Sequence, residues 1–114
     1  MLVNQRIDGG HMAGRWEFPG GKREVREGRF AALTRELREE LGIEVSAADE
    51  LLAYTHDYPE QVVHLHVLRV TAYSGEPAGL EGQPLRWVAV DQLMEAGLLP
   101  ADRPIAETLR ANLP

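Results

Sequence analysis

Three glutamates within the stretch RELREELG (35–42) have a spacing that could bind a divalent cation. On a helix, Glu36, Glu39 and Glu40 fall within an arc of roughly 100° on one face. Like charges placed three or four residues apart repel each other and oppose helix formation. Mg²⁺ takes oxygen ligands and shares its coordination with substrate phosphates, so a bound ion would remove this repulsion. The stretch alone therefore fits two alternatives, a solvated acidic helix face or a metal-binding face.

The residues around these glutamates predict the helix that positions them. Phe30, Leu33, Leu37 and Leu41 recur at spacings of three and four and are predicted to form the core face of an amphipathic helix. Gly42 follows at the position where many helices end in a left-handed glycine. The acidic face thus adjoins the face that packs in the core.

The rest of the chain is predicted to mix strands and helices. Trp87 lies on one of the strands and is predicted to be part of the core. Because strands and helices do not alternate regularly, we expect an α+β fold with a mixed sheet flanked by helices. The predicted strands cover residues 1–6, 51–58, 62–73 and 85–90, and the predicted helices after Gly42 cover 91–97 and 103–113.

Composition excludes several classes of protein. The chain has 114 residues and no cysteine, which suits one domain spanning residues 1–114 and excludes disulfides, thiolate zinc sites and thiol catalysis. A net charge of -6 argues against a nucleic acid polymer as partner, because such a partner normally needs a basic face. No apolar run reaches membrane-spanning length, so we expect no membrane partner and a cytoplasmic location.

A longer pattern encloses the three glutamates. It has the form G-x5-E-x7-R-E-U-x-E-E-x-G-U, with U aliphatic, and its chance occurrence at background residue frequencies is on the order of 10⁻⁹ per starting position. This pattern is the Nudix box, so the sequence resembles the Nudix hydrolases. HMAGRWEFPGGK (11–22), LEGQPLRWV (80–88) and LLPADRPI (98–105) are similar to the MutT-like branch of that family. The box is filled by Gly21, Glu27, Arg35, Glu36, Leu37, Glu39, Glu40, Gly42 and Ile43.

The resemblance implies a fold and a reaction. The fold would be the Nudix fold, an α/β/α sandwich around a mixed sheet. The reaction would be attack of water on a phosphorus of a nucleoside triphosphate, releasing monophosphate and pyrophosphate, with Mg²⁺ (Mn²⁺ is also possible) as cofactor. Relatives usually carry a further strand before the position of Met1, so we expect this chain to lack the usual first strand. Either the start is truncated or another subunit completes the sheet edge, which leaves monomer and homodimer both open.

The resemblance also assigns roles to individual residues. Glu36 is a candidate for assisting the attacking water. Glu27 and Arg35 would support the geometry of loop and helix through a salt bridge, with Gly21 and Gly42 as further structural members of the box. The predicted metal ligands are the carbonyl of Gly20 and the carboxylates of Glu36, Glu39, Glu40 and Glu81, and these four glutamates are also the predicted catalytic residues.

Recognition of the nucleotide is predicted to involve Arg6, Phe18, Gln61 and Asp102. An ionised Asp102 accepts hydrogen bonds and suits the amino group of cytosine or adenine. Asp102 could also bind oxidised guanine, either when protonated or through the donor edge of that base. Asp102 could instead cap the last helix, or serve both roles. The substrate alternatives are 8-oxo-dGTP, as in nucleotide-pool sanitisation and DNA repair, or CTP, dCTP or 5-methyl-dCTP. A nucleotide-binding Nudix domain without turnover is a third alternative, against which the intact box argues.

Two histidines, His64 and His66, point the same way on a predicted strand. Their spacing could bind a metal, but two ligands without a third are weak support for zinc. We therefore expect them to be structural or to line the ligand pocket.

Overall fold

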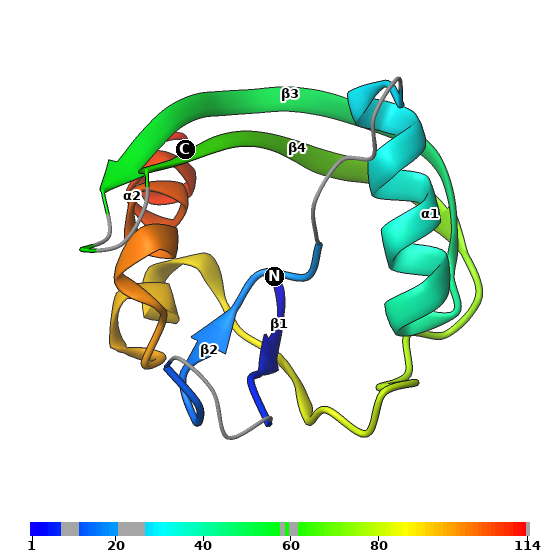
Figure 1. Cartoon of the computed structure of the whole chain (residues 1–114), viewed down its shortest axis with the longest axis horizontal. Helices are drawn as coiled ribbons and strands as arrows, with labels where there is room; N and C mark the ends of the chain where they lie inside the picture. Colours follow the sequence, from blue (N-terminus) through cyan, green and yellow to red (C-terminus); the bar gives the residue numbers. More distant parts are fainter. Residues whose placement is uncertain (8–11, 21–26, 58, 60–61, 114) are drawn as a thin grey trace.

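The computed structural model describes residues 1–7, 12–20, 27–57, 59 and 62–113. Two helices, α1 and α2, stand on opposite sides of the molecule with β-strands between them (Figure 1). Within the described part of the chain, no helix is long and apolar enough to cross a membrane. The elements in order are β1 (Leu2–Gln5), β2 (Trp16–Glu17), α1 (Arg29–Leu41), β3 (Glu44–Asp57), β4 (Val62–Ser74), β5 (Leu85–Trp87), the 3₁₀ helices η1 (Val90–Glu95) and η2 (Pro100–Asp102), and α2 (Arg103–Ala111).

The strands form two antiparallel sheets, in the orders β2-β1-β5 and β3-β4. The α+β class is confirmed, but the single mixed sheet that we expected is not formed by the described strands. β1 uses both of its edges, pairing with β2 on one side and with β5 on the other. Among the described strands, neither β2 nor β5 pairs with the hairpin of β3 and β4. The one parallel contact among the described residues is the bridge between Trp16 and Leu98.

The strand β3 is longer than its sequence suggested. We predicted a strand from residue 51, yet β3 begins at Glu44 and includes the segment AADE (47–50). It pairs with β4 along its whole length, with register irregularities between Val45 and Ala47, between Ala47 and Ala48, and between Glu50 and Leu52. Register shifts of this kind interrupt the regular ladder, and β-bulges among them bend a strand. The hairpin arches from α1 to α2 over the three-stranded sheet (Figure 1).

The helix α1 matches its prediction closely. It ends at Leu41, and Gly42 takes the expected left-handed conformation with φ of 72°. Leu37 and Leu41 are buried. Phe30 is a correction, because its side chain is 45% exposed. It lies in the first turn, beside Ala48 and Leu68 in a shallow depression that is open to solvent.

The core is divided between the two sides of the three-stranded sheet. Because neighbouring residues on a strand point to opposite faces, Val3 packs toward α2 while Leu2 packs toward α1. Trp87, which we predicted to be in the core, is 63% exposed. It stands opposite Leu2 on β5, the edge strand of its sheet, and has a neighbouring strand on one side only. The buried clusters are Val3, Leu93, Leu98, Ile105, Ala106 and Leu109 near α2, and Leu37, Leu41, Ile43 and Val45 near α1.

Candidate active site

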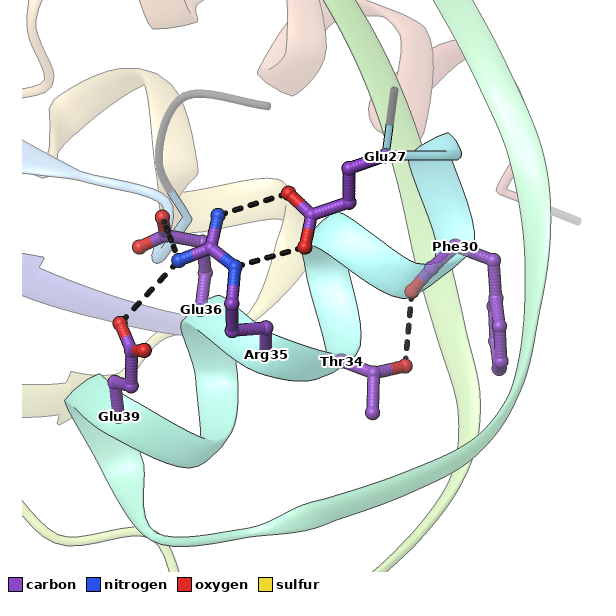
Figure 2. A network of polar contacts seen from close by, with 6 residues as sticks. All are labelled: Glu27, Phe30, Thr34, Arg35, Glu36 and Glu39. Carbon is purple, nitrogen blue, oxygen red and sulfur yellow. Dashed lines mark hydrogen bonds and ion pairs between the residues drawn. The ribbon is translucent and has the colours of Figure 1, made fainter. Parts of the chain in front are cut away.

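Arg35, at the middle of α1, forms ion pairs with several carboxylates (Figure 2). Its Nε and Nη2 donate to the two carboxylate oxygens of Glu27 at 2.8 and 3.0 Å, which is the ion pair that the sequence predicted. Its Nη1 lies 3.0 Å from Glu36 Oε1 and 3.4 Å from Glu39 Oε2. One guanidinium therefore offsets much of the repulsion between two of the three helix glutamates.

Glu40 points toward the loop that follows β2. The backbone N–H of Gly20 donates to Glu40 Oε2 at 3.1 Å. Burial raises the pKa of Glu40 to about 7, with further contributions from the negative charges of Glu36 and Glu81. The Gly20 hydrogen bond acts in the opposite direction, because it favours the ionised carboxylate. Glu36, Glu40 and Glu81 are therefore close enough for their charges to interact.

Gly20 needs to be glycine for this arrangement. Its φ is 146°, a backbone conformation that residues with a side chain rarely adopt. The turn built on it lets the N–H of Gly20 reach the carboxylate of Glu40. The loop and the helix are thus joined at the predicted metal site.

The loop that carries Glu81 is fastened to the C-terminal end of α1. Leu80 N–H donates to the carbonyl of Glu40 at 3.1 Å, and Ala78 N–H donates to the carbonyl of Leu41 at 3.0 Å. These bonds use carbonyls that a helix end would otherwise leave without partners. Gln83 also takes part in the attachment, and we did not single it out from the sequence. Its only signal there was its place in the EGQP segment.

The predicted metal ligands have the right chemistry, although their side chains do not converge on one point. Among residues that the structure describes, no three histidine or acidic side chains are placed to hold an ion. Glu36 and Glu39 turn toward Arg35, whereas Glu40 turns toward Gly20. The donors are nonetheless all oxygens with interacting negative charges, and this is the set that suits a hard divalent cation. The site therefore fits such an ion by donor type.

The two histidines of β4 belong to a different surface. His64 and His66 are exposed, and His64 Nδ1 lies 3.1 Å from Thr55 Oγ1 on the neighbouring strand. This cross-strand contact is compatible with the structural role, one of the two roles that we expected, and the assignment stays a prediction.

Asp102 lies in a second polar region, between β2 and α2. Its Oδ2 accepts a hydrogen bond of 2.9 Å from the backbone N–H of Phe18, a residue 84 positions earlier in the chain. The side chain makes no capping hydrogen bond to α2, although Asp102 occupies the N-cap position. The capping role that we considered is therefore wrong. Burial raises the pKa of Asp102 to about 6, and the negative charge of Glu17 also raises it.

Arg6 is held by Glu17, a residue that sequence reasoning missed. The Nε of Arg6 donates to Glu17 Oε2 at 2.9 Å. The charge of Glu17 reaches both polar regions, since it also contributes to the raised pKa of Glu40. Its place directly before Phe18 in the EFPGG segment was the available signal. Two predicted residues, Gly21 and Gln61, lie outside the described residues.

Comparison with known proteins gives consistent results. A family model for the NUDIX domain matches residues 1–108. The CTP pyrophosphohydrolase of Escherichia coli K12 is 37% identical, with 97% of this chain and 82% of the relative aligned. The 8-oxo-dGTP diphosphatase of the same strain is 34% identical, with 96% of this chain and 85% of the relative aligned. A solved structure from work on MutT of Aliivibrio salmonicida and Vibrio cholerae superposes with a TM-score of 0.86 at 34% identity, covering 99% of this chain and 86% of that one.

Proposed function

Because the chain belongs to the NUDIX domain family of hydrolases, we propose that it hydrolyses nucleoside triphosphates to monophosphate and pyrophosphate with Mg²⁺ or Mn²⁺ as cofactor. The observation that carries this proposal is the half-buried Glu40 carboxylate, which accepts from Gly20 N–H and whose pKa is raised to about 7 by burial and by the negative charges of Glu36 and Glu81. Negative charges held together in this way at a cost in free energy are suited to a cation.

Each part of the site has a task in the proposed reaction. The four glutamates and the carbonyl of Gly20 would hold the cation, which supplies charge neutralisation for the phosphate oxygens and a lower pKa for a bound water. Arg35 keeps the carboxylates of Glu36 and Glu39 beside each other through its ion pairs with both. Arg6, aligned by its ion pair with Glu17, would bind the nucleotide. Glu36 is the candidate for orienting the attacking water.

Two bases are candidates for the nucleoside part of the substrate. Oxidised guanine is the first candidate, because a relative at 34% identity is named as an 8-oxo-dGTP diphosphatase. A specific observation favours cytosine as the second candidate. Asp102 is a buried carboxylate that already accepts from Phe18 N–H, and above pH 7 it can only accept, which suits the amino group of CTP, dCTP or 5-methyl-dCTP. The relative named as a CTP pyrophosphohydrolase agrees with this candidate.

A screen for release of pyrophosphate tests the proposal. The purified chain is incubated at pH 8 with Mg²⁺ and each of the canonical, oxidised and methylated nucleoside triphosphates. We expect pyrophosphate and monophosphate from at least one of them, and no product when the divalent ions are removed with a chelator. Folded protein that binds nucleotide without cleaving any triphosphate would instead support the alternative of a non-catalytic Nudix domain.

A further inference from the structure

We propose that Gln83 is a positioning residue that sets the location of the Glu81 carboxylate relative to the catalytic helix. The inference rests on the proposed function, since Glu81 and Glu40 matter to the reaction only if they hold the cation. Gln83 itself would not touch the substrate or the ion. It would act through Glu81, by fixing the backbone of the loop that carries this residue.

The side chain of Gln83 makes one hydrogen bond to each part that it joins. Its Oε1 accepts from the backbone N–H of Glu81 at 2.9 Å. Its Nε2 donates to the backbone carbonyl of Glu40 at 3.1 Å. The amide therefore links the backbones of two predicted ligands, Glu81 in the loop and Glu40 on α1. Such a link holds the two residues at a set separation whatever their side chains do.

Burial makes this link difficult to replace. Gln83 is 8% exposed, one of two buried polar or charged residues in the described part of the chain. The surrounding loop is close-packed, because a side chain at Gly79 would come within 2.1 Å of the carbonyl oxygen of Gln83. Removing the amide would leave the Glu81 N–H without its acceptor, which is costly. The Glu40 carbonyl would lose one of its two donors and keep the Leu80 N–H. A variant lacking the amide would therefore let the loop move toward water.

Within the described part of the chain, the side chain of Glu81 adds no contact that would fix its position. Its side chain is exposed, and among the described residues no hydrogen bond or ion pair engages its carboxylate. The position of its carboxylate therefore depends on the backbone of the loop, to which Gln83, Leu80 and Ala78 supply the bonds with α1.

A double-mutant cycle between Gln83 and Glu81 tests the inference. The variants are Gln83→Met, which keeps the size of the side chain and removes the amide, Glu81→Gln, and the two combined. Two quantities are measured for each, kcat for the best triphosphate and the affinity for Mn²⁺ alone by electron paramagnetic resonance. We expect Gln83→Met to weaken Mn²⁺ binding and to lower kcat by ~10-fold, as for other residues that orient a metal ligand. The combined variant should be no worse than Glu81→Gln by itself.

Two results would overturn the inference. One is a combined variant whose loss of kcat or of Mn²⁺ affinity equals the product of the two single losses. Gln83 would then act independently of Glu81. The other is wild-type Mn²⁺ affinity and kcat in Gln83→Met. If the wild-type chain cleaves no triphosphate, the proposed function is overturned instead. The double-mutant cycle measured by Mn²⁺ affinity then decides the role of Gln83.

Controls separate positioning from general loss of structure. Gln92 lies exposed on η1, so Gln92→Met makes the same chemical change away from the site and should match the wild type in both measurements. Circular dichroism checks that each variant is folded. If Gln83→Met does not fold, Gln83→Glu replaces it in the cycle. That variant keeps the acceptor for Glu81 N–H but loses the donor to the Glu40 carbonyl, and the same non-additivity is expected.

Discussion

Two polar regions of this molecule are built in opposite ways. The α1 cluster, defined here as Glu27, Arg35, Glu36, Glu39 and Glu40, joins residues within 14 positions along the chain, and several of its ion pairs are partly exposed. The Asp102 contact joins Phe18 N–H to a carboxylate 84 residues later and is buried. The first region has several charges that share partners, whereas the second depends on one carboxylate. We therefore expect the α1 cluster to control the rate of reaction and the Asp102 contact to control stability and choice of base.

The largest effect is expected from Glu40→Gln. Loss of this charge should lower kcat by at least ~10²-fold, because a predicted metal ligand is removed while its shape is kept. Steady-state kinetics on the best triphosphate measures the change, and circular dichroism shows whether the fold is retained. Glu44→Gln is the matched control, since Glu44 is exposed and, within the part of the chain that the structure describes, its ion pair is with Arg38. Turnover near the wild-type value in Glu40→Gln would remove the α1 cluster from the mechanism.

Asp102 should make stability depend on pH in a defined direction. Its pKa is about 6 in the folded chain against its usual 3.8, so the unfolded chain loses this proton first as the pH rises. The free energy of unfolding therefore falls between about pH 4 and pH 6 and then levels off. At about 1.4 kcal/mol per pKa unit, the decrease is ~3 kcal/mol.

Asp102→Asn isolates this contribution from other titrating groups. The neutral amide should make the chain more stable than the wild type by ~3 kcal/mol at pH 7, with little difference below pH 4. Urea denaturation at pH 4, 5, 6 and 7 measures both chains. If the two chains differ in free energy of unfolding by the same amount at every pH, Asp102 does not have a raised pKa in the folded chain.

The same variant should change the choice of base by a smaller factor. An asparagine both donates and accepts, so Asp102→Asn should raise the ratio of kcat/KM for 8-oxo-dGTP over that for dCTP by ~10-fold, or about 1.4 kcal/mol. The comparison is made at pH 8, where the wild-type carboxylate is ionised. An unchanged ranking of the two substrates would mean that Asp102 is structural only.

The smallest effect is expected at the Arg38–Glu44 ion pair. Arg38 Nε lies 2.7 Å from Glu44 Oε1, yet both side chains are more than half exposed. Exposed ion pairs contribute little to stability, so Arg38→Gln should keep wild-type kinetics and change the melting temperature by less than ~3 °C. A large loss of kcat in Arg38→Gln would show that charged residues of α1 outside the α1 cluster also affect the rate of reaction.

Local parts of the structure were predictable from the sequence. The apolar spacing predicted a helix from residue 30 to 41, and the structure has α1 at Arg29–Leu41. Gly42 was predicted as its end and has the left-handed conformation. The Glu27–Arg35 pair followed from the Nudix box and is present. These features depend on residues near each other in the chain, whose relative positions are largely set by helical geometry.

Features that depend on neighbouring strands were predicted less well. Trp87 was expected in the core but lies on an edge strand. The early start of β3 was missed because the segment EVSAADE (44–50) has three acidic residues and no regular apolar alternation, and pairing with β4 keeps it in the strand. Glu17 and Gln83 were missed for a similar reason. Their hydrogen-bond partners, Arg6 and the Glu40 carbonyl, lie 11 and 43 positions away along the chain.

The sequence by itself determined the family, the acidic face of α1 and the residues available to hold a cation, because spacing along a helix fixes direction in space. The tertiary structure decided which way those side chains turn, toward Arg35 or toward Gly20. It also decided that Asp102 contacts Phe18 instead of capping α2. Such contacts depend on how β2, α2 and the loop after β4 are packed together, and no local pattern of residues contains that information.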